Sequence, residues 1–86
     1  MLTLEFTIEP FVEGQPGPHV MSAVAAVEAL GVEVEFGPFG SACSIEESRA
    51  GEVAAAIFSA AFAHGASHVT MFAARDRADD PDAKAT

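Results

Sequence analysis

The sequence predicts an α+β fold in which a four-stranded antiparallel sheet carries two helices on one face. Four segments alternate apolar and polar residues, the third less clearly than the others, and alternation is typical of half-buried strands. Two further segments space their apolar residues as a helix does. The order is strand, helix, strand, strand, helix, strand, which is the split βαβ or ferredoxin-like pattern. Right-handed crossovers then place the first and third strands in the middle of the sheet.

The first strand has the clearest pattern of the chain. Its apolar and polar residues alternate strictly: Leu2, Leu4, Phe6 and Ile8 against Thr3, Glu5, Thr7 and Glu9. Proline has no N–H to donate to a neighbouring strand, so the strand should end at Pro10. Residues 12–18, VEGQPGP, then form a loop.

The first helix and the next two strands follow from spacing and from glycines. Apolar residues at helical spacing predict a helix over about residues 18–30, with Gly31 in the C-cap position. Residues 32–36 alternate again and predict the second strand. The Gly-Pro-Phe-Gly segment at 37–40 breaks it, and residues 41–45 form the third strand, in which the side of Cys43 is ambiguous.

The second helix begins after residues 46–48, where Ser48 is a candidate cap, and it ends at His64 and Gly65. Its expected buried stripe consists of Val53, Ala54, Ile57, Phe58, Ala61 and Phe62. Residues 67–74 alternate once more and predict the last strand. We therefore expect one ferredoxin-like domain over residues 1–75 and a disordered tail over residues 76–86.

One face of this sheet has no helix to cover it. Its expected residues are Thr3, Glu5, Thr7, Glu9, Glu33, Glu35, Thr70 and Phe72. An uncovered sheet in so small a protein is either solvated or buried against another subunit.

The charge of the chain limits its partners. Four basic residues stand against thirteen acidic ones, for a net charge of −9, which disfavours nucleic acid. The charge permits a cationic small molecule or a basic protein, and alternatively it only keeps the protein soluble. No apolar run approaches the ~20 residues of a membrane helix, so no membrane partner is expected. Cys43 is the only cysteine, so no internal disulfide can form, and we expect a cytoplasmic protein.

No residue pattern indicates catalysis or a metal. No serine or cysteine lies in a motif that would activate it. The three histidines, His19, His64 and His68, do not have metal-ligand spacing, and His64 is better interpreted as a helix cap. We therefore expect no enzyme activity, no metal and no cofactor. One alternative stays open, because Glu33 and Glu35 lie ~7 Å apart on a strand and could form an acid–base pair of a small hydrolase or isomerase.

Two loops at one end of the sheet offer a binding site. Glu9 and Phe11 follow the first strand, while Phe39 and Ser41 belong to the connection between the second and third strands. Because the first two strands run parallel, these four residues can converge. Aromatic rings beside a carboxylate and a hydroxyl would suit a flat, partly cationic heterocycle. The alternative is that Phe11 and Phe39 close the end of the core.

Three segments resemble the small thiamine-binding protein family: EFTIEPF at 5–11, GVEVEFGPFGS at 31–41 and FAHGASHVT at 62–70. The resemblance spans about residues 4–75. Its most specific part is residues 37–41, which are similar to the Gly-Pro-x-Gly-Thr hairpin of that family with Ser in place of Thr. Two departures bear on the ligand rather than the fold: Ser44-Ile45 stands where members have Glu-Gly, and Arg75-Asp76-Arg77 replaces the usual polar residues after the last strand.

The resemblance implies a ferredoxin-like fold and non-catalytic binding of thiamine or its hydroxymethylpyrimidine part. It also implies assembly through the sheets into homodimers or tetramers. The ligand-binding residues that it implies are Glu9, Phe11, Phe39 and Ser41. The alternative function is a structural or regulatory self-associating module without a small-molecule ligand.

Overall fold

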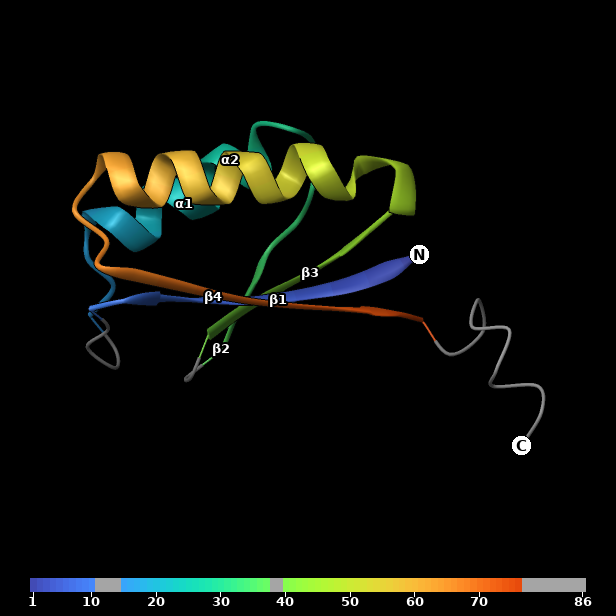
Figure 1. Cartoon of the computed structure of the whole chain (residues 1–86), viewed down its shortest axis with the longest axis horizontal. Helices are drawn as coiled ribbons and strands as arrows, with labels where there is room; N and C mark the ends of the chain where they lie inside the picture. Colours follow the sequence, from blue (N-terminus) through green and yellow to red (C-terminus); the bar gives the residue numbers. More distant parts are fainter. Residues whose placement is uncertain (11–14, 38–39, 77–86) are drawn as a thin grey trace.

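The structure, a computed structural model, describes residues 1–10, 15–37 and 40–76. Its elements are β1 (Leu2–Glu9), α1 (Pro18–Glu28), β2 (Glu35–Gly37), β3 (Gly40–Ile45), the 3₁₀ turn η1 (Glu47–Arg49), α2 (Ala50–Ala63) and β4 (His68–Arg75). The sheet has the order β2-β3-β1-β4, and every neighbouring pair is antiparallel. Both helices cover the same face (Figure 1). The predicted ferredoxin-like βαββαβ sandwich is therefore confirmed.

Strand β1 is central, as predicted, and supplies much of the core. It pairs with β4 over its whole length and with β3 from Leu2 to Phe6. Leu4, Phe6 and Ile8 point to the helices and are almost completely buried. The strand ends at Glu9, and Glu9 accepts a backbone hydrogen bond of 2.7 Å from the N–H of Ser67. Because the helices cover only one face of the sheet, the other face of β1 carries polar residues.

Helix α1 begins at Pro18, as predicted, and ends at Glu28, two residues earlier than expected. Its buried residues, Val20, Ala23, Val24 and Val27, face the sheet. Gly31 follows with a positive φ of 82°, which a glycine adopts without strain. At the other end His19 is buried, and its Nε2 hydrogen-bonds the carbonyl of Pro10, which joins the start of α1 to the end of β1.

The second strand is shorter than the sequence predicts. Only Glu35–Gly37 pairs with β3, whereas residues 32–34 lie outside the ladder. Figure 1 shows this segment crossing from the helix layer down to the sheet. Val32 in this crossing segment is buried. At the start of the segment, the Arg49 guanidinium donates a 2.7 Å hydrogen bond to the carbonyl of Leu30. The valines that alternate in residues 32–34, and from which a strand was predicted, belong to this crossing segment and not to a strand.

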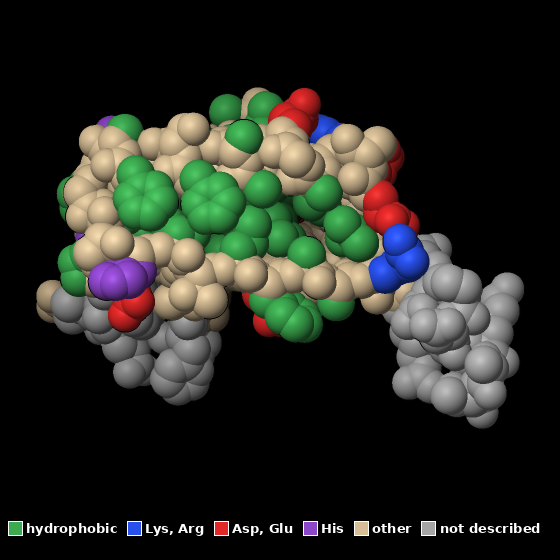
Figure 2. Space-filling view, in the orientation of Figure 1, with side chains coloured by type: hydrophobic (Ala, Val, Ile, Leu, Met, Phe, Trp, Pro, Cys, Tyr) green, Lys and Arg blue, Asp and Glu red, His purple; other side chains and the backbone are tan. Residues whose placement is uncertain are grey.

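The buried stripe of α2 is narrower than predicted. Val53, Ile57 and Ala61 are buried, but the side chains of Phe58 and Phe62 are 40% and 52% exposed. The prediction that both phenylalanines are buried is wrong. Helix α2 lies above β4, the last strand of the sheet, so no further strand extends the described sheet beneath its outer side (Figure 1). Hydrophobic side chains are exposed along α2 on this side of the molecule (Figure 2).

The ends of α2 differ in how well they were predicted. Ser48 makes no capping side-chain bond, because η1 precedes the helix and Arg49 occupies the N-cap position. His64 is the C-cap residue, as predicted, and its Nδ1 lies 2.9 Å from the carbonyl oxygen of Ala60.

The last described residue is held by the first strand. The N–H of Asp76 donates to the carbonyl of Met1, and its carboxylate accepts a hydrogen bond from the Thr3 hydroxyl, each at 2.9 Å. The remainder of the predicted tail, residues 77–86, lies outside the described residues. None of the helices in the described part of the chain is long and apolar enough to cross a membrane.

Candidate functional site: a groove on the open face of the sheet

The face of the sheet opposite the helices carries a groove of about 430 Å³. One level of the ladder crosses all four strands there: Phe72 pairs with Glu5, Glu5 with Ala42, and Ala42 with Glu35. Side chains of paired residues point to the same face of a sheet. This row therefore projects a phenyl ring and two carboxylates from the open face. We call the hollow between them the open-face groove.

The floor of the open-face groove is formed by residues with small side chains or none. Ala42 separates the two carboxylates, and Gly37 pairs with Gly40 on the adjoining level. A Cβ on Gly40 would lie 2.9 Å from Oγ1 of Thr7 and 3.0 Å from the carbonyl oxygen of Phe6, so a side chain does not fit at this position. The backbone of β3 is therefore accessible at the floor, between the larger side chains of β1 and β2.

Aromatic and hydroxyl groups form the walls. Phe72 of β4 projects from the open face and is 61% exposed, whereas Phe36 of the edge strand β2 pairs with Ser41 and therefore points to the helix side. Thr7 and Thr70, which are paired across β1 and β4, add hydroxyls next to Phe72. The exposed phenyl ring of Phe72 beside a flat floor can hold a planar ring by stacking or edge contacts.

The electrostatic character of the open-face groove is acidic. Glu5 and Glu35 lie two strands apart, so their backbones are separated by ~10 Å at the usual strand spacing. No lysine or arginine lines the groove among the described residues. Arg49 and Arg75 are engaged elsewhere, with Glu52 at 2.7 Å and with Glu47 at 2.9 Å. A ligand with a positive charge or with N–H donors matches this environment.

The four site residues predicted from the loops fall into three groups. Glu9 is exposed on the open face, two residues beyond Thr7, and its partner in β4 is His68. Ser41 pairs with the core residue Phe6 and is 6% exposed, so its hydroxyl is on the helix side of the sheet. The structure thus places the side chains of Glu9 and Ser41 on opposite faces. Phe11 and Phe39 lie outside the described residues.

Most residues of the open-face groove carried a signal in the sequence. The alternation of the strands placed Glu5, Thr7, Thr70 and Phe72 on the uncovered face, where the structure has them. The sequence analysis missed that they form a site, because the floor depends on lateral register. Only the pairing of Ala42 with both Glu5 and Glu35 reveals the hollow.

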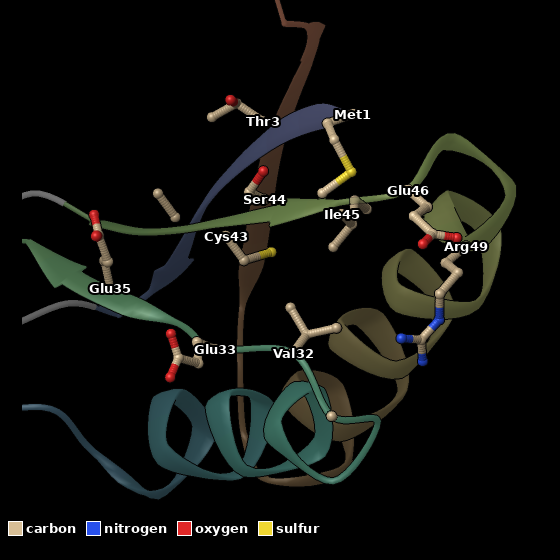
Figure 3. A pocket seen from close by; sticks show the side chains of 12 residues that line it. Met1, Thr3, Val32, Glu33, Glu35, Cys43, Ser44, Ile45, Glu46 and Arg49 are labelled. Carbon is tan, nitrogen blue, oxygen red and sulfur yellow. The ribbon is translucent and has the colours of Figure 1, made fainter.

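A second cavity, of about 510 Å³, opens where the segment before β2 leaves the sheet, and we call it the side cleft. Val32 and Cys43 point into it, with Glu33 and Glu35 toward one end and Glu46 and Arg49 toward the other (Figure 3). The alternation left Cys43 ambiguous, and the structure places it in the core.

The chemistry of the side cleft is less suited to a ligand than that of the open-face groove. Burial raises the pKa of the Cys43 thiol above its ordinary value of 9.0, so the thiol stays protonated and is a poor nucleophile near neutral pH. No aromatic side chain lines the cleft among the described residues. In the same part of the chain no three His, Cys, Asp or Glu side chains are grouped to hold a metal ion.

Comparison with known proteins identifies the fold but no family. No family model matches the chain, and no curated protein matches it in sequence. Among solved structures, the chain is similar to a domain of unknown function, DUF77, from Bacillus cereus, with 22% identity and a TM-score of 0.61. That match covers 85% of this chain and 71% of the other.

A hypothetical protein from Methanocaldococcus jannaschii is similar over 96% of this chain and 90% of its own. The identity is 17% and the TM-score 0.59. Both likenesses support the sandwich architecture described above.

Proposed function

We propose that this chain is a non-catalytic binding protein for thiamine or a related pyrimidine such as hydroxymethylpyrimidine. In this proposal the protein is cytoplasmic and homo-oligomeric, and it sequesters or delivers its ligand. One observation carries the proposal: a flat-floored groove in which the exposed phenyl ring of Phe72 stands in one row with two carboxylates, without a basic residue among its described lining. The resemblance of residues 5–11, 31–41 and 62–70 to the thiamine-binding family supports the same ligand class.

The groove would act on each part of the ligand by a separate interaction. The planar pyrimidine would lie over Ala42 and the two glycines, with Phe72 at one edge. Its exocyclic amine would donate to Glu5 or Glu35. The thiazolium cation of thiamine would be attracted by the same carboxylates and by the ring face of Phe72. No chemical step is part of the proposal.

Isothermal titration with thiamine and with hydroxymethylpyrimidine tests the proposal. We expect saturable binding of both, and about tenfold weaker thiamine binding after Glu5→Gln or Glu35→Gln, because each change removes a charge-assisted contact. Glu28→Gln is the matched control, since Glu28 is exposed on α1 far from the groove and its loss should leave affinity unchanged. Absence of heat with ligand at about 1 mM, the range of the weakest specific complexes, would remove the proposal.

A self-associating module without a ligand is the second candidate. The observation that favours it is the 61% exposure of Phe72, which β4 carries on the uncovered face of the sheet. Under this alternative the open face is covered by another subunit and the groove is filled by its side chains. Phe72→Glu would then dissociate the assembly, and neither ligand would bind to the intact protein.

A further inference from the structure

The outer edge of β3 is covered over only part of its length. β2 pairs with residues 40–42, and the crossing segment at residues 32–34 stays outside the ladder. Among the described residues, no strand therefore lies beside residues 43–45 on this side, while β1 pairs with their other side. We call residues 43–45 the uncovered edge. The side cleft opens beside it, since all three residues line that cavity.

Ser44 is the residue of the uncovered edge whose backbone N–H and C=O point away from β1. Successive residues of an antiparallel strand direct these groups to alternate neighbours. Gly37 and Gly40 close a two-residue hairpin and so form a hydrogen-bonded pair. Every second residue of β3 after Gly40, Ala42 and then Ser44, has the same orientation. Ala42 meets Glu35 on that side, whereas in the described structure Ser44 meets no strand and offers one donor and one acceptor.

The side cleft has room for a short extended peptide along this edge. Its volume of about 510 Å³ lies within the range of ~300–1,000 Å³ that is usual for ligand sites. The side chains of such a peptide would alternate between two environments. On the helix side they would meet Val32 and Cys43, which are both buried (Figure 3). On the open face they would meet the hydroxyls of Thr3 and Ser44, so the cleft fits a strand with apolar residues at every second position.

The charged groups around the side cleft favour a basic peptide. The exposed Glu33 lies toward one end of the cleft and the exposed Glu46 toward the other (Figure 3). Neither carboxylate makes an ion pair within the described part of the chain. Arg49 also lines the cleft, but its guanidinium already donates to the carbonyl of Leu30 and to Glu52, each at 2.7 Å. Lysine or arginine at the two ends of a bound peptide would match these carboxylates.

We propose that the side cleft binds an extended segment of a basic partner protein, which joins the sheet as a short strand beside β3. The central residue of the segment exchanges two backbone hydrogen bonds with Ser44, and the apolar residues next to it point toward Val32. Basic residues at its ends face Glu33 and Glu46. In this mode of recognition the main chain provides affinity and the alternate side chains provide specificity. A second copy of this chain, with a net charge of −9, would bring further carboxylates to an acidic rim, so it does not fit.

This inference does not depend on the ligand of the proposed function. The side cleft and the open-face groove share Glu35 and Ala42, so neither of these residues is used to test it. Ser44 lines only the side cleft, and Glu5 lines only the groove. Substitutions at these two positions therefore separate the two proposals.

Fluorescence anisotropy of a labelled peptide, Lys-Val-Thr-Val-Lys with blocked ends, provides the test on the full chain. We expect saturable binding with a dissociation constant on the order of 10–100 μM. The same peptide with glutamate in place of both lysines is the control for charge and should bind at least ~10-fold more weakly. Glu33→Gln combined with Glu46→Gln should remove most of this difference between the two peptides.

Methylation of single peptide nitrogens tests the strand pairing itself. N-methylation of the central threonine removes the N–H that faces Ser44, so it should weaken binding at least ~10-fold. N-methylation of a neighbouring valine is the matched control, because that N–H points away from β3, and affinity should stay within about 2-fold.

Two variants of Ser44 test the protein side of the contact. Ser44→Pro removes the N–H that faces the cleft, and proline is tolerated at such a position of an edge strand, so we expect peptide binding to be lost. Ser44→Ala retains the N–H and should bind like the wild type. Glu5→Gln should weaken thiamine binding and leave the peptide affinity unchanged, while Ser44→Pro should have the reverse effect. If Ser44→Pro fails to fold, the methylated peptides decide the question.

Three results would overturn the proposal. The first is the absence of binding at about 1 mM of the basic peptide. The second is equal binding of the basic and acidic peptides. The third is equal binding of the peptides that are methylated at threonine and at valine, which would show that no backbone pairing with β3 occurs.

Discussion

Ala42 determines whether the open-face groove exists. Its methyl group lies between Glu5 and Glu35, so a larger side chain there would fill the floor without entering the core. We expect Ala42→Leu to weaken thiamine binding at least ~10-fold, while the melting temperature shifts little because surface changes on a sheet are small in effect. Ser44→Leu is the control, since Ser44 lies on the same face of β3 but outside the groove. Equal loss of affinity in both variants would argue against this site.

Gly40 is the second residue on which the groove depends. A Cβ there would be 2.9 Å from the Thr7 hydroxyl and 3.0 Å from a backbone oxygen, so the strands would have to separate. We expect Gly40→Ala to lower the free energy of unfolding by about 1–3 kcal/mol, measured by urea denaturation. Gly51→Ala is the counterpart: nothing lies within 4 Å of its Cβ position in α2, and it should stabilise by about 0.5–1 kcal/mol. Identical effects of the two changes would contradict the close approach.

Cys43 gives the fold a pH dependence in the alkaline range. Burial raises the pKa of this thiol above 9.0 in the folded state, so the folded protein holds its proton more tightly than the unfolded chain. This contribution to stability is complete below about pH 9 and is lost as the pH rises through the folded pKa. Urea denaturation at increasing pH should show this decline in the wild type, and Cys43→Ala should flatten it. A decline that is equally steep in Cys43→Ala would assign the effect to other groups.

At the scale of elements, the connection between α1 and β2 shapes the side cleft. Arg49 holds it through the carbonyl of Leu30 at 2.7 Å and is itself paired with Glu52. We expect Arg49→Ala to lower the free energy of unfolding by about 1 kcal/mol and to speed hydrogen exchange over residues 31–34. Glu52→Gln removes only the partly exposed ion pair, so its effect should stay within about 0.5 kcal/mol. If exchange over residues 31–34 is the same in all three proteins, Arg49 does not hold this segment.

The sequence predicted elements where local pattern and tertiary packing agree. Strand β1 alternates and is covered on one face only, and α1 is framed by Pro18 and Gly31, so both could be placed from spacing and caps. Residues 32–34 alternate as well, but they descend from the helix layer and pair with nothing in the sheet. The spacing of the apolar residues indicates which side chains are buried, but it does not indicate whether a neighbouring strand is present.

Phe58 and Phe62 show the same limit for helices. Their spacing fits the buried stripe, but the position of α2 over the end of the sheet leaves them half exposed. The binding site was predictable in part: the uncovered face and its carboxylates follow from alternation, whereas the floor at Ala42 requires the register between three strands. The period of a single strand contains no information on that register.

At the scale of the whole molecule, the charge of −9 acts on any charged ligand. Thiamine is a cation, and its attraction to the protein should be screened by salt, with a Debye length of ~30 Å at 0.01 M and ~3 Å at 1 M. We expect its affinity to fall several-fold between these ionic strengths. Hydroxymethylpyrimidine is neutral at pH 7 and should bind almost equally at both. Parallel salt dependence for the two ligands would show that the carboxylates do not act on the cationic ring.

Nuclear magnetic resonance titration of the ¹⁵N-labelled full chain with thiamine tests the central claim most directly, because it reports every backbone amide at once. The account predicts that the shifted amides cluster at Thr7, Gly37, Gly40, Ala42 and Phe72, around the open-face groove, while those of Val32 and Ile45 in the side cleft stay in place. Shifts confined to the side cleft, or a spectrum that thiamine leaves unchanged at millimolar concentration, would contradict it.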